Sequence, residues 1–145
     1  MSAEVTSKSA VILVNLGTPE EPTPAAVRKF LREFLSDQRV VEIPKPIWWV
    51  ILNCFILPRR PIKVAKAYAS IWTEQGSPLR AITIAQMNGV RELLNAELGF
   101  EDTEVCYAMS YGKPGLVEQI ERLEKSGVNR IAVIPLYPQY SATTT

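Results

Sequence analysis

The sequence predicts an α/β fold in which parallel strands form a sheet with helices on both faces. Three short apolar runs, at residues 10–16, 104–109 and 130–136, have the length and composition of strands buried on both faces. Segments with helical periodicity separate them, and this order is typical of a parallel sheet. The last run leads into tyrosine, serine and threonine residues at 137–145, where open α/β sheets place their ligands.

The N-terminal part of the chain predicts a strand followed by a helix. Gly17-Thr18-Pro19 ends the first strand, and Thr23-Pro24 supplies an N-cap and a first-turn proline for a helix that we expect to reach Ser36. A short extended segment is expected at 40–43. The apolar residues of the helix recur at the spacing of one face, and they are Val27, Phe30, Leu31, Phe34 and Leu35.

A long insertion separates the first two strands. It begins with an apolar stretch at 47–57, bounded by Pro46 and Pro58, and we expect helices at about 62–72 and 79–98. The insertion is too long for a simple crossover between strands, so we expect it to carry specialised surface.

The C-terminal part predicts strand, helix and strand. A helix at 114–125 follows the strand at 104–109, and Gly127 suits the position just after the end of that helix. The final strand at 130–136 runs into the hydroxyl-rich stretch, and no further helix follows. We therefore expect this chain to be part of a longer protein whose remainder holds the reactive groups.

Composition restricts the chemistry that the chain can perform. Its 145 residues suffice for one domain, and a net charge of +1 gives no overall attraction to nucleic acid. It has no histidine, and Cys54 and Cys106 form no disulfide or zinc pattern. No secretion signal is visible, and the apolar stretch is shorter than the ~20 residues of a membrane span. We expect a soluble, cytoplasmic protein, and we assign its carboxylates to solvated surface.

The loops that follow the three strands meet at one edge if the sheet is parallel. These loops, 17–19, 110–114 and 137–145, offer Tyr, Thr, Ser and one Lys. The absence of G-x-G-x-x-G and G-K-[ST] patterns disfavours the usual modes of nucleotide binding. Tyrosine faces and hydroxyls suit a large planar ligand with a few anionic groups. The alternative is that each loop is only a connection, with a threonine as N-cap of a further helix.

The apolar stretch at 47–57 has two interpretations. Its apolar residues surround the helix, which is typical of a buried core helix. The pair Trp48-Trp49, between Lys45 and the Arg59-Arg60-Lys63 cluster, instead favours an exposed lip that covers a hydrophobic ligand or rests on a membrane surface. The same cations could pair with carboxylates of a ligand.

Four segments of the chain resemble ferrochelatases, the enzymes of haem biosynthesis that insert ferrous iron into a porphyrin. In the family's order they are ILVNLGTP at 12–19, PRRPIK at 58–63, QGSPL at 75–79 and LYPQYSATT at 136–144. The resemblance covers residues 10–145. It implies a chelatase-like, three-layer α/β/α lobe with a parallel sheet, the first of two similar lobes that hold the porphyrin between them. The chain is then the N-terminal lobe, with an apolar lip at about 30–58.

The resemblance also implies which residues contact the ligand. Leu16 lies where family members place a Tyr or Met near the metal path, and Arg60 and Lys63 match basic residues at the mouth of the porphyrin site. The implied porphyrin-binding residues are Leu16, Arg60, Lys63, Tyr111, Tyr137, Ser141 and Thr143. Ferrous iron enters as a substrate, and no metal ligand is assigned. A peripheral membrane contact through Trp48 and Trp49 is a further expectation.

Three departures limit what the resemblance implies. The family's catalytic His and its partner Glu belong to the second lobe, beyond Thr145, so we expect no catalytic residue here and no activity from this chain alone. Ser110 stands where many relatives have a basic residue. Ala142 stands where animal family members have an iron–sulfur ligand, so neither that cluster nor another resident cofactor is expected.

Two alternatives to the enzyme remain at this stage. The first is a porphyrin-binding or periplasmic-binding-protein-like module without catalysis, and the presence of a second lobe with a His and a Glu would decide against it. The second is a flavodoxin-like domain, which is disfavoured because the loop after the first strand lacks a hydroxyl-rich phosphate cradle.

Overall fold

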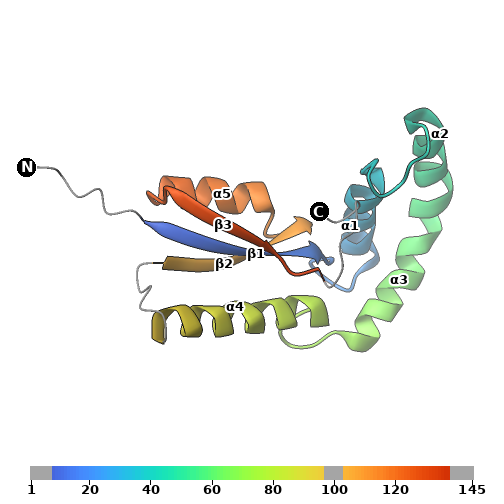
Figure 1. Cartoon of the computed structure of the whole chain (residues 1–145). Helices are drawn as coiled ribbons and strands as arrows, with labels where there is room; N and C mark the ends of the chain where they lie inside the picture. The colour runs from blue at the N-terminus through green and yellow to red at the C-terminus, as the bar shows by residue number, and fades with distance from the viewer. Residues whose placement is uncertain (1–7, 97–102, 138–145) are drawn as a thin grey trace, which may run out of the picture.

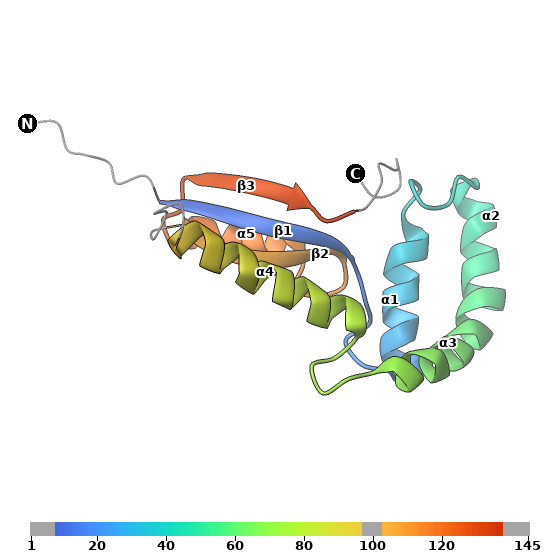
Figure 2. The same cartoon turned by 60° about the horizontal axis from the view of Figure 1, so that its bottom comes forward.

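The computed structural model of the chain describes residues 8–96 and 103–137. It has two regions, which are visible in Figures 1 and 2. One is a sheet layer, formed by residues 8–17, 78–96 and 103–137, and the other is a helical arm, formed by residues 24–71. The arm stands beyond the end of the sheet at which the strand arrows point.

The sheet has three strands in the order β2-β1-β3, and both pairings are parallel. They are β1 (Ser9–Gly17), β2 (Thr103–Tyr111) and β3 (Arg130–Pro135). In the middle strand, Ile12 is in register with Cys106 on one side and Val133 on the other. The predicted parallel sheet is therefore confirmed, and the carboxyl ends of all three strands lie at one edge.

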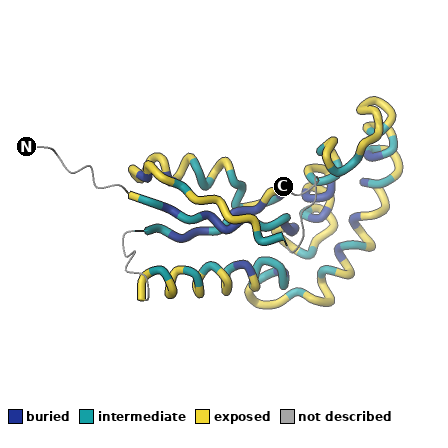
Figure 3. The backbone as a smooth tube through the Cα atoms, in the orientation of Figure 1, coloured by how far each residue is buried: buried dark blue, intermediate teal, exposed yellow. Residues whose placement is uncertain are grey.

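Helices cover both faces of the sheet, as predicted. Figure 1 shows α5 (Leu116–Lys125) on one face and α4 (Pro78–Ala96) on the other. Under α5, Ile12, Ala108 and Leu123 are fully buried. Strand β3 lies at an open edge of the sheet and is mostly exposed (Figure 3). The three-layer α/β/α architecture that the resemblance implied is thus observed.

The helical arm pairs α1 (Pro24–Ser36) with a long helical segment that runs antiparallel to it. This segment consists of α2 (Lys45–Val50), the π-helix η1 (Ile51–Ile56) and α3 (Leu57–Ile71). Helix α1 has the predicted bounds, and the Oγ1 of Thr23 accepts the N–H of Ala26 at 3.3 Å as the N-cap. The predicted second helix, 62–72, begins too late, because Pro58 and Pro61 do not interrupt the observed helix.

The π-helix keeps the buried side of the long segment turned toward α1. Leu52, Leu57, Pro61 and Ala65 are the buried residues of this side, so one of its steps is five residues instead of four. Five residues of α-helix at about 100° each would rotate Leu57 well past the side that Leu52 occupies. The wider turn, in which the N–H of Leu57 donates to the carbonyl of Leu52, corrects this rotation.

The extended segment expected at 40–43 does not form. The N–H groups of Val40 and Val41 both donate to the carbonyl of Asp37, at 3.0 and 3.1 Å, which makes this connection a tight turn. The Oδ1 of Asp37 also accepts the N–H of Arg39 at 2.8 Å. Such local bonds from an aspartate side chain favour turns over strands. The prediction failed because Asp37 was not considered.

Candidate ligand-binding rim

A cavity of about 520 Å³ lies at the carboxyl edge of the sheet, where the predicted loops meet. We call it the rim cavity. Its apolar lining comes from strands β1 and β3 and from the start of α5, through Val14, Val133, Pro135 and Val117. Its polar lining comes from the strand ends and the helical arm, through Ser110, Tyr111, Tyr137, Arg39, Glu33 and Glu118. The cavity thus joins the two regions of the molecule.

Tyr137 and Ser110 meet across the middle strand. Beyond the end of β3, the N–H of Leu136 donates to the carbonyl of Val14 at 2.8 Å, which continues the sheet and carries Tyr137 to its edge. There the hydroxyl of Tyr137 lies 2.6 Å from the Oγ of Ser110 at the end of β2. Because β2 and β3 flank β1 on opposite sides, this hydrogen bond spans the end of β1.

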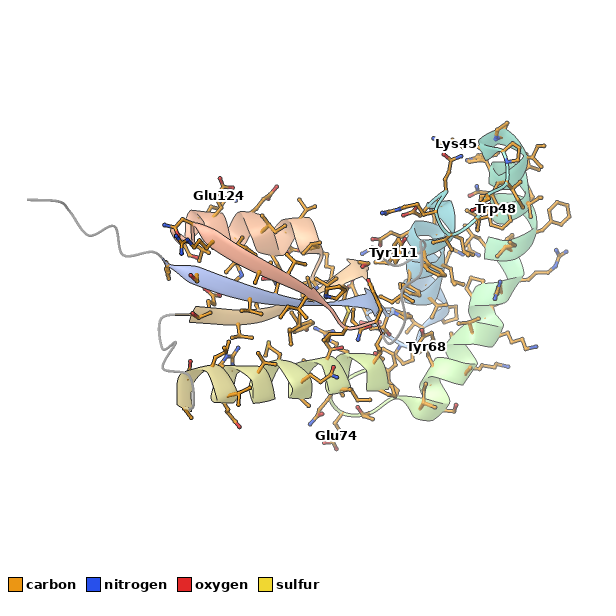
Figure 4. All side chains as sticks on the ribbon, viewed as in Figure 1. Lys45, Trp48, Tyr68, Glu74, Tyr111 and Glu124 are labelled. Carbon is orange, nitrogen blue, oxygen red and sulfur yellow. The ribbon has the colours of Figure 1, made fainter. Side chains whose placement is uncertain are left out.

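Tyr111 fastens the sheet layer to the helical arm. Its hydroxyl donates to the Oδ2 of Asp37 at 2.9 Å, and its ring meets that of Phe34 edge-on, with the centroids 5.1 Å apart. Figure 4 shows Tyr111 at the junction of the two regions. Burial of the phenol, followed by its bond to the Asp37 carboxylate, raises the pKa of Tyr111 to about 12. Tyr111 is therefore a neutral hydrogen-bond donor at neutral pH.

Asp37 also holds Arg39. The guanidinium of Arg39 donates from Nη2 to Oδ2 at 2.7 Å, and from Nε to the carboxylate at 3.1 and 3.2 Å. This guanidinium, together with the backbone N–H of Arg39, holds the pKa of Asp37 well below its usual range. Sequence analysis missed both residues. The signal was present in Asp37-Gln38-Arg39 after the end of a helix, a pattern suited to an aspartate-capped turn.

Close backbone packing joins the loops after β1 and β2. Gly17 has a φ of +124°, and a Cβ atom there would lie 1.9 Å from the carbonyl oxygen of Tyr111. The N–H of Gly112 donates to the Oε1 of Glu33 at 3.2 Å. These contacts leave no space for a side chain at Gly17, and they fix the end of β2 against both β1 and α1.

The structure separates the predicted ligand residues into groups. Tyr111 and Tyr137 lie together at the rim cavity, although the hydroxyl of Tyr111 is already bound to Asp37. Leu16 is half-buried and packs against the apolar cluster of the helical arm. Arg60 and Lys63 are exposed on α3 and do not line the rim cavity. Ser141 and Thr143 lie outside the described residues, as does Ala142.

The lip prediction is right for some residues and wrong for others. The side chain of Trp49 is 64% exposed, and Ile47 and Phe55 beside it are similarly exposed. Trp48 instead turns inward, where its indole N–H donates to the carbonyl of Leu35 at 2.6 Å (Figure 4). Phe30, at the start of the expected lip, is buried in the arm cluster. The long helical segment therefore has one buried side and one exposed apolar side.

Two further searches covered the described residues. In 8–96 and 103–137, no three or more His, Cys, Asp or Glu side chains come together in a group that could hold a metal ion. Over the same residues, every helix is too short or too polar to cross a membrane.

Comparison with known proteins assigns the chain. The ferrochelatase family profile matches residues 8–145. Over 137 residues, covering 94% of the chain, it is 50% identical to the ferrochelatase of Alcanivorax borkumensis SK2, of which the match covers 40%. It is 53% identical over 142 residues to that of Janthinobacterium sp. strain Marseille, with 97% and 38% covered. It is 51% identical over 145 residues to that of Acinetobacter baumannii strain ACICU, with 100% and 43% covered. The chain thus spans about two fifths of the length of these curated relatives.

Proposed function

The chain belongs to the ferrochelatase family, and we propose that it forms the porphyrin-binding N-terminal lobe of an enzyme that inserts ferrous iron into a porphyrin to make haem. The family match over residues 8–145 carries the proposal. The rim cavity supports it, because its volume of about 520 Å³ lies within the usual range for small-molecule sites of roughly 300–1,000 Å³. Its lining combines apolar side chains with a few hydroxyls, as a planar ligand with polar edges requires.

The chemistry defines what this lobe has to contribute. A porphyrin must lose two N–H protons before iron can enter its plane, and its nitrogen lone pairs point into the ring. Holding the ring in a bent form exposes a lone pair, which uses binding energy to reach the transition state. In this proposal Tyr137 and the apolar lining hold the ring, and the base that accepts the protons lies in a second lobe. The chain alone should therefore bind porphyrin without inserting iron.

Arg60 and Lys63 are proposed to meet carboxylate groups of the porphyrin. They lie one turn apart on the exposed side of α3, and both are free to reach a ligand edge. Removing one charge-assisted contact costs about 1.5–3 kcal/mol, or roughly ten- to hundred-fold in binding. In the full-length enzyme, Arg60→Ala should raise the KM for porphyrin and leave kcat nearly unchanged. Tyr137→Ala should change both constants, because it removes a side chain that holds the bent ring.

Steady-state zinc or iron insertion assays test this assignment. Lys66→Ala, at another exposed cation of α3, is the matched control and should change neither constant. Equal and negligible effects of Arg60→Ala and Tyr137→Ala would reject the ligand roles while leaving the family membership intact. Absence of insertion activity in the unaltered full-length protein would reject the proposed function itself.

The exposed side of the helical arm is proposed to rest on a membrane surface on the cytoplasmic side. Trp49, Ile47 and Phe55 present apolar area there, and cations follow on α3 at Arg59 and Lys63. This combination favours binding to anionic lipid. Trp49→Ser should reduce co-sedimentation with phosphatidylglycerol vesicles, whereas Ile82→Ser, at an equally exposed residue of α4, should not. Equal effects of both substitutions would contradict a specific membrane face.

A further inference from the structure

The rim cavity contains a cation that the ligand assignments above do not use. Its charged lining residues are Arg39, Glu33 and Glu118, so Arg39 is the group there that can attract an acidic ligand. The Arg39 side chain is 66% exposed, which leaves its guanidinium accessible from the cavity. It belongs to the turn between α1 and α2, so the helical arm brings it to the edge of the sheet.

The guanidinium is held in place before any ligand arrives. Asp37 binds it through Nε and Nη2, which occupies two of its five N–H donors and leaves donors for a second carboxylate. Asp37 is itself fixed by the N–H of Arg39 and the hydroxyl of Tyr111. An arginine oriented in this way loses little side-chain entropy when it binds a ligand, and its planar fork matches a carboxylate.

The other polar groups of the cavity restrict where an acid can bind. The hydroxyls of Ser110 and Tyr137, which bond each other, offer additional hydrogen bonds to a ligand. Glu33 and Glu118 repel an anion, and Glu33 is fixed by the N–H of Gly112. An acidic group is therefore favoured close to Arg39 and disfavoured elsewhere in the cavity.

We propose that Arg39 binds a carboxylate side chain of the porphyrin in the rim cavity, and that Asp37 and Tyr111 are positioning residues that hold it there. This inference rests on the proposed function and adds to it a carboxylate-binding residue on the turn after α1. It assigns the acidic edge of the porphyrin a second contact besides the α3 cations.

The test compares a porphyrin with and without free acids. Mesoporphyrin IX carries two carboxylates, and its dimethyl ester carries none. Fluorescence titration of the full-length protein gives the Kd for each. Arg39→Gln should weaken binding of the free acid about ten- to hundred-fold and leave the Kd of the ester within about two-fold. Arg39→Lys, which keeps the charge but loses the fork, should lie between the two. Asp37→Asn should weaken binding of the acid only, by a smaller factor.

Arg122→Gln is the matched control. Arg122 also forms an ion pair, at 2.7 Å with Glu104, but this pair lies near the opposite end of β2 and its loss should change neither Kd. Equal weakening of the acid and the ester by Arg39→Gln would show a merely structural role and overturn the proposal. Unchanged binding of both porphyrins would overturn it as well, with the proposed function intact. Failure of the unaltered protein to bind either porphyrin would overturn both.

Discussion

The sheet layer and the helical arm bury their apolar residues to very different degrees. In the sheet layer, Ile12, Ala108 and Leu123 are completely enclosed between strands and helix. In the arm, Ile47, Trp49 and Phe55 are each more than half exposed, although they occupy a helix as apolar as any core segment (Figure 3). The sheet layer therefore stabilises the fold, whereas the outer side of the arm is available for binding.

The two regions meet through a small set of contacts at the end of α1. Tyr111 bonds Asp37 and packs edge-on against Phe34, and Gly112 bonds Glu33. These contacts place the arm beside the rim cavity, so they connect the stable region to the binding region. Substitutions in the core, at the junction and on the arm should therefore have separable consequences.

The largest effect on stability is expected in the sheet layer. Ile12→Ala should lower the free energy of unfolding by about 2–5 kcal/mol, because it leaves a cavity under α5. Phe55→Ala removes a larger side chain from the arm, yet it should cost less than about 0.5 kcal/mol because Phe55 is 59% exposed. Urea unfolding of both variants measures the difference. Similar losses would show that the arm contributes to the same core.

A smaller effect is expected where the loops after β1 and β2 pack together. Gly17→Ala should cost about 1–3 kcal/mol, because alanine at its positive φ is strained and its Cβ meets the carbonyl of Tyr111. Gly127 also has a positive φ, +83°, but open space surrounds its Cβ position, so Gly127→Ala should cost only about 1 kcal/mol. Thermal unfolding distinguishes them. Equal losses would mean that the close approach at Gly17 relaxes freely.

The smallest effect is expected at the junction, and it should depend on pH. Tyr111→Phe removes one hydrogen bond and should cost about 0.5–1.5 kcal/mol at pH 7. The folded pKa of Asp37 is depressed, so the stability that its ionised form contributes is complete above its unfolded pKa of about 4 and declines as the pH falls below that value. The deficit of Asp37→Asn relative to the unaltered protein should therefore shrink in acid. Unfolding measured between pH 7 and pH 3 tests this, and a deficit that grows in acid would contradict it.

Local signals in the sequence predicted the sheet layer and α1. Thr23 and Pro24 mark the start of α1, and Gly127, with its positive φ, marks the end of α5, because each acts through its own backbone. The buried strands followed from their apolar runs. The parallel arrangement then placed Tyr137 and Ser110 at one edge before any contact was known.

The rest depended on contacts between distant parts of the chain. The π-helix forms because Leu52 and Leu57 must both face α1, and no local pattern encodes that requirement. The inward turn of Trp48 depends on the carbonyl of Leu35. The roles of Asp37 and Arg39 required knowing that Tyr111, 74 residues further along the chain, lies beside them. Charged residues in a short connection gave no sign of this.

Hydrogen exchange with and without mesoporphyrin IX is the most direct test of the central claim, that the ligand binds where the sheet edge meets the arm. The account predicts slower exchange on binding at 37–41, 110–117 and 133–137, with no change in the exposed C-terminal half of α4 or at the amino ends of the strands. Protection confined to α4 and α5, with none at the sheet edge or in the turn after α1, would contradict it.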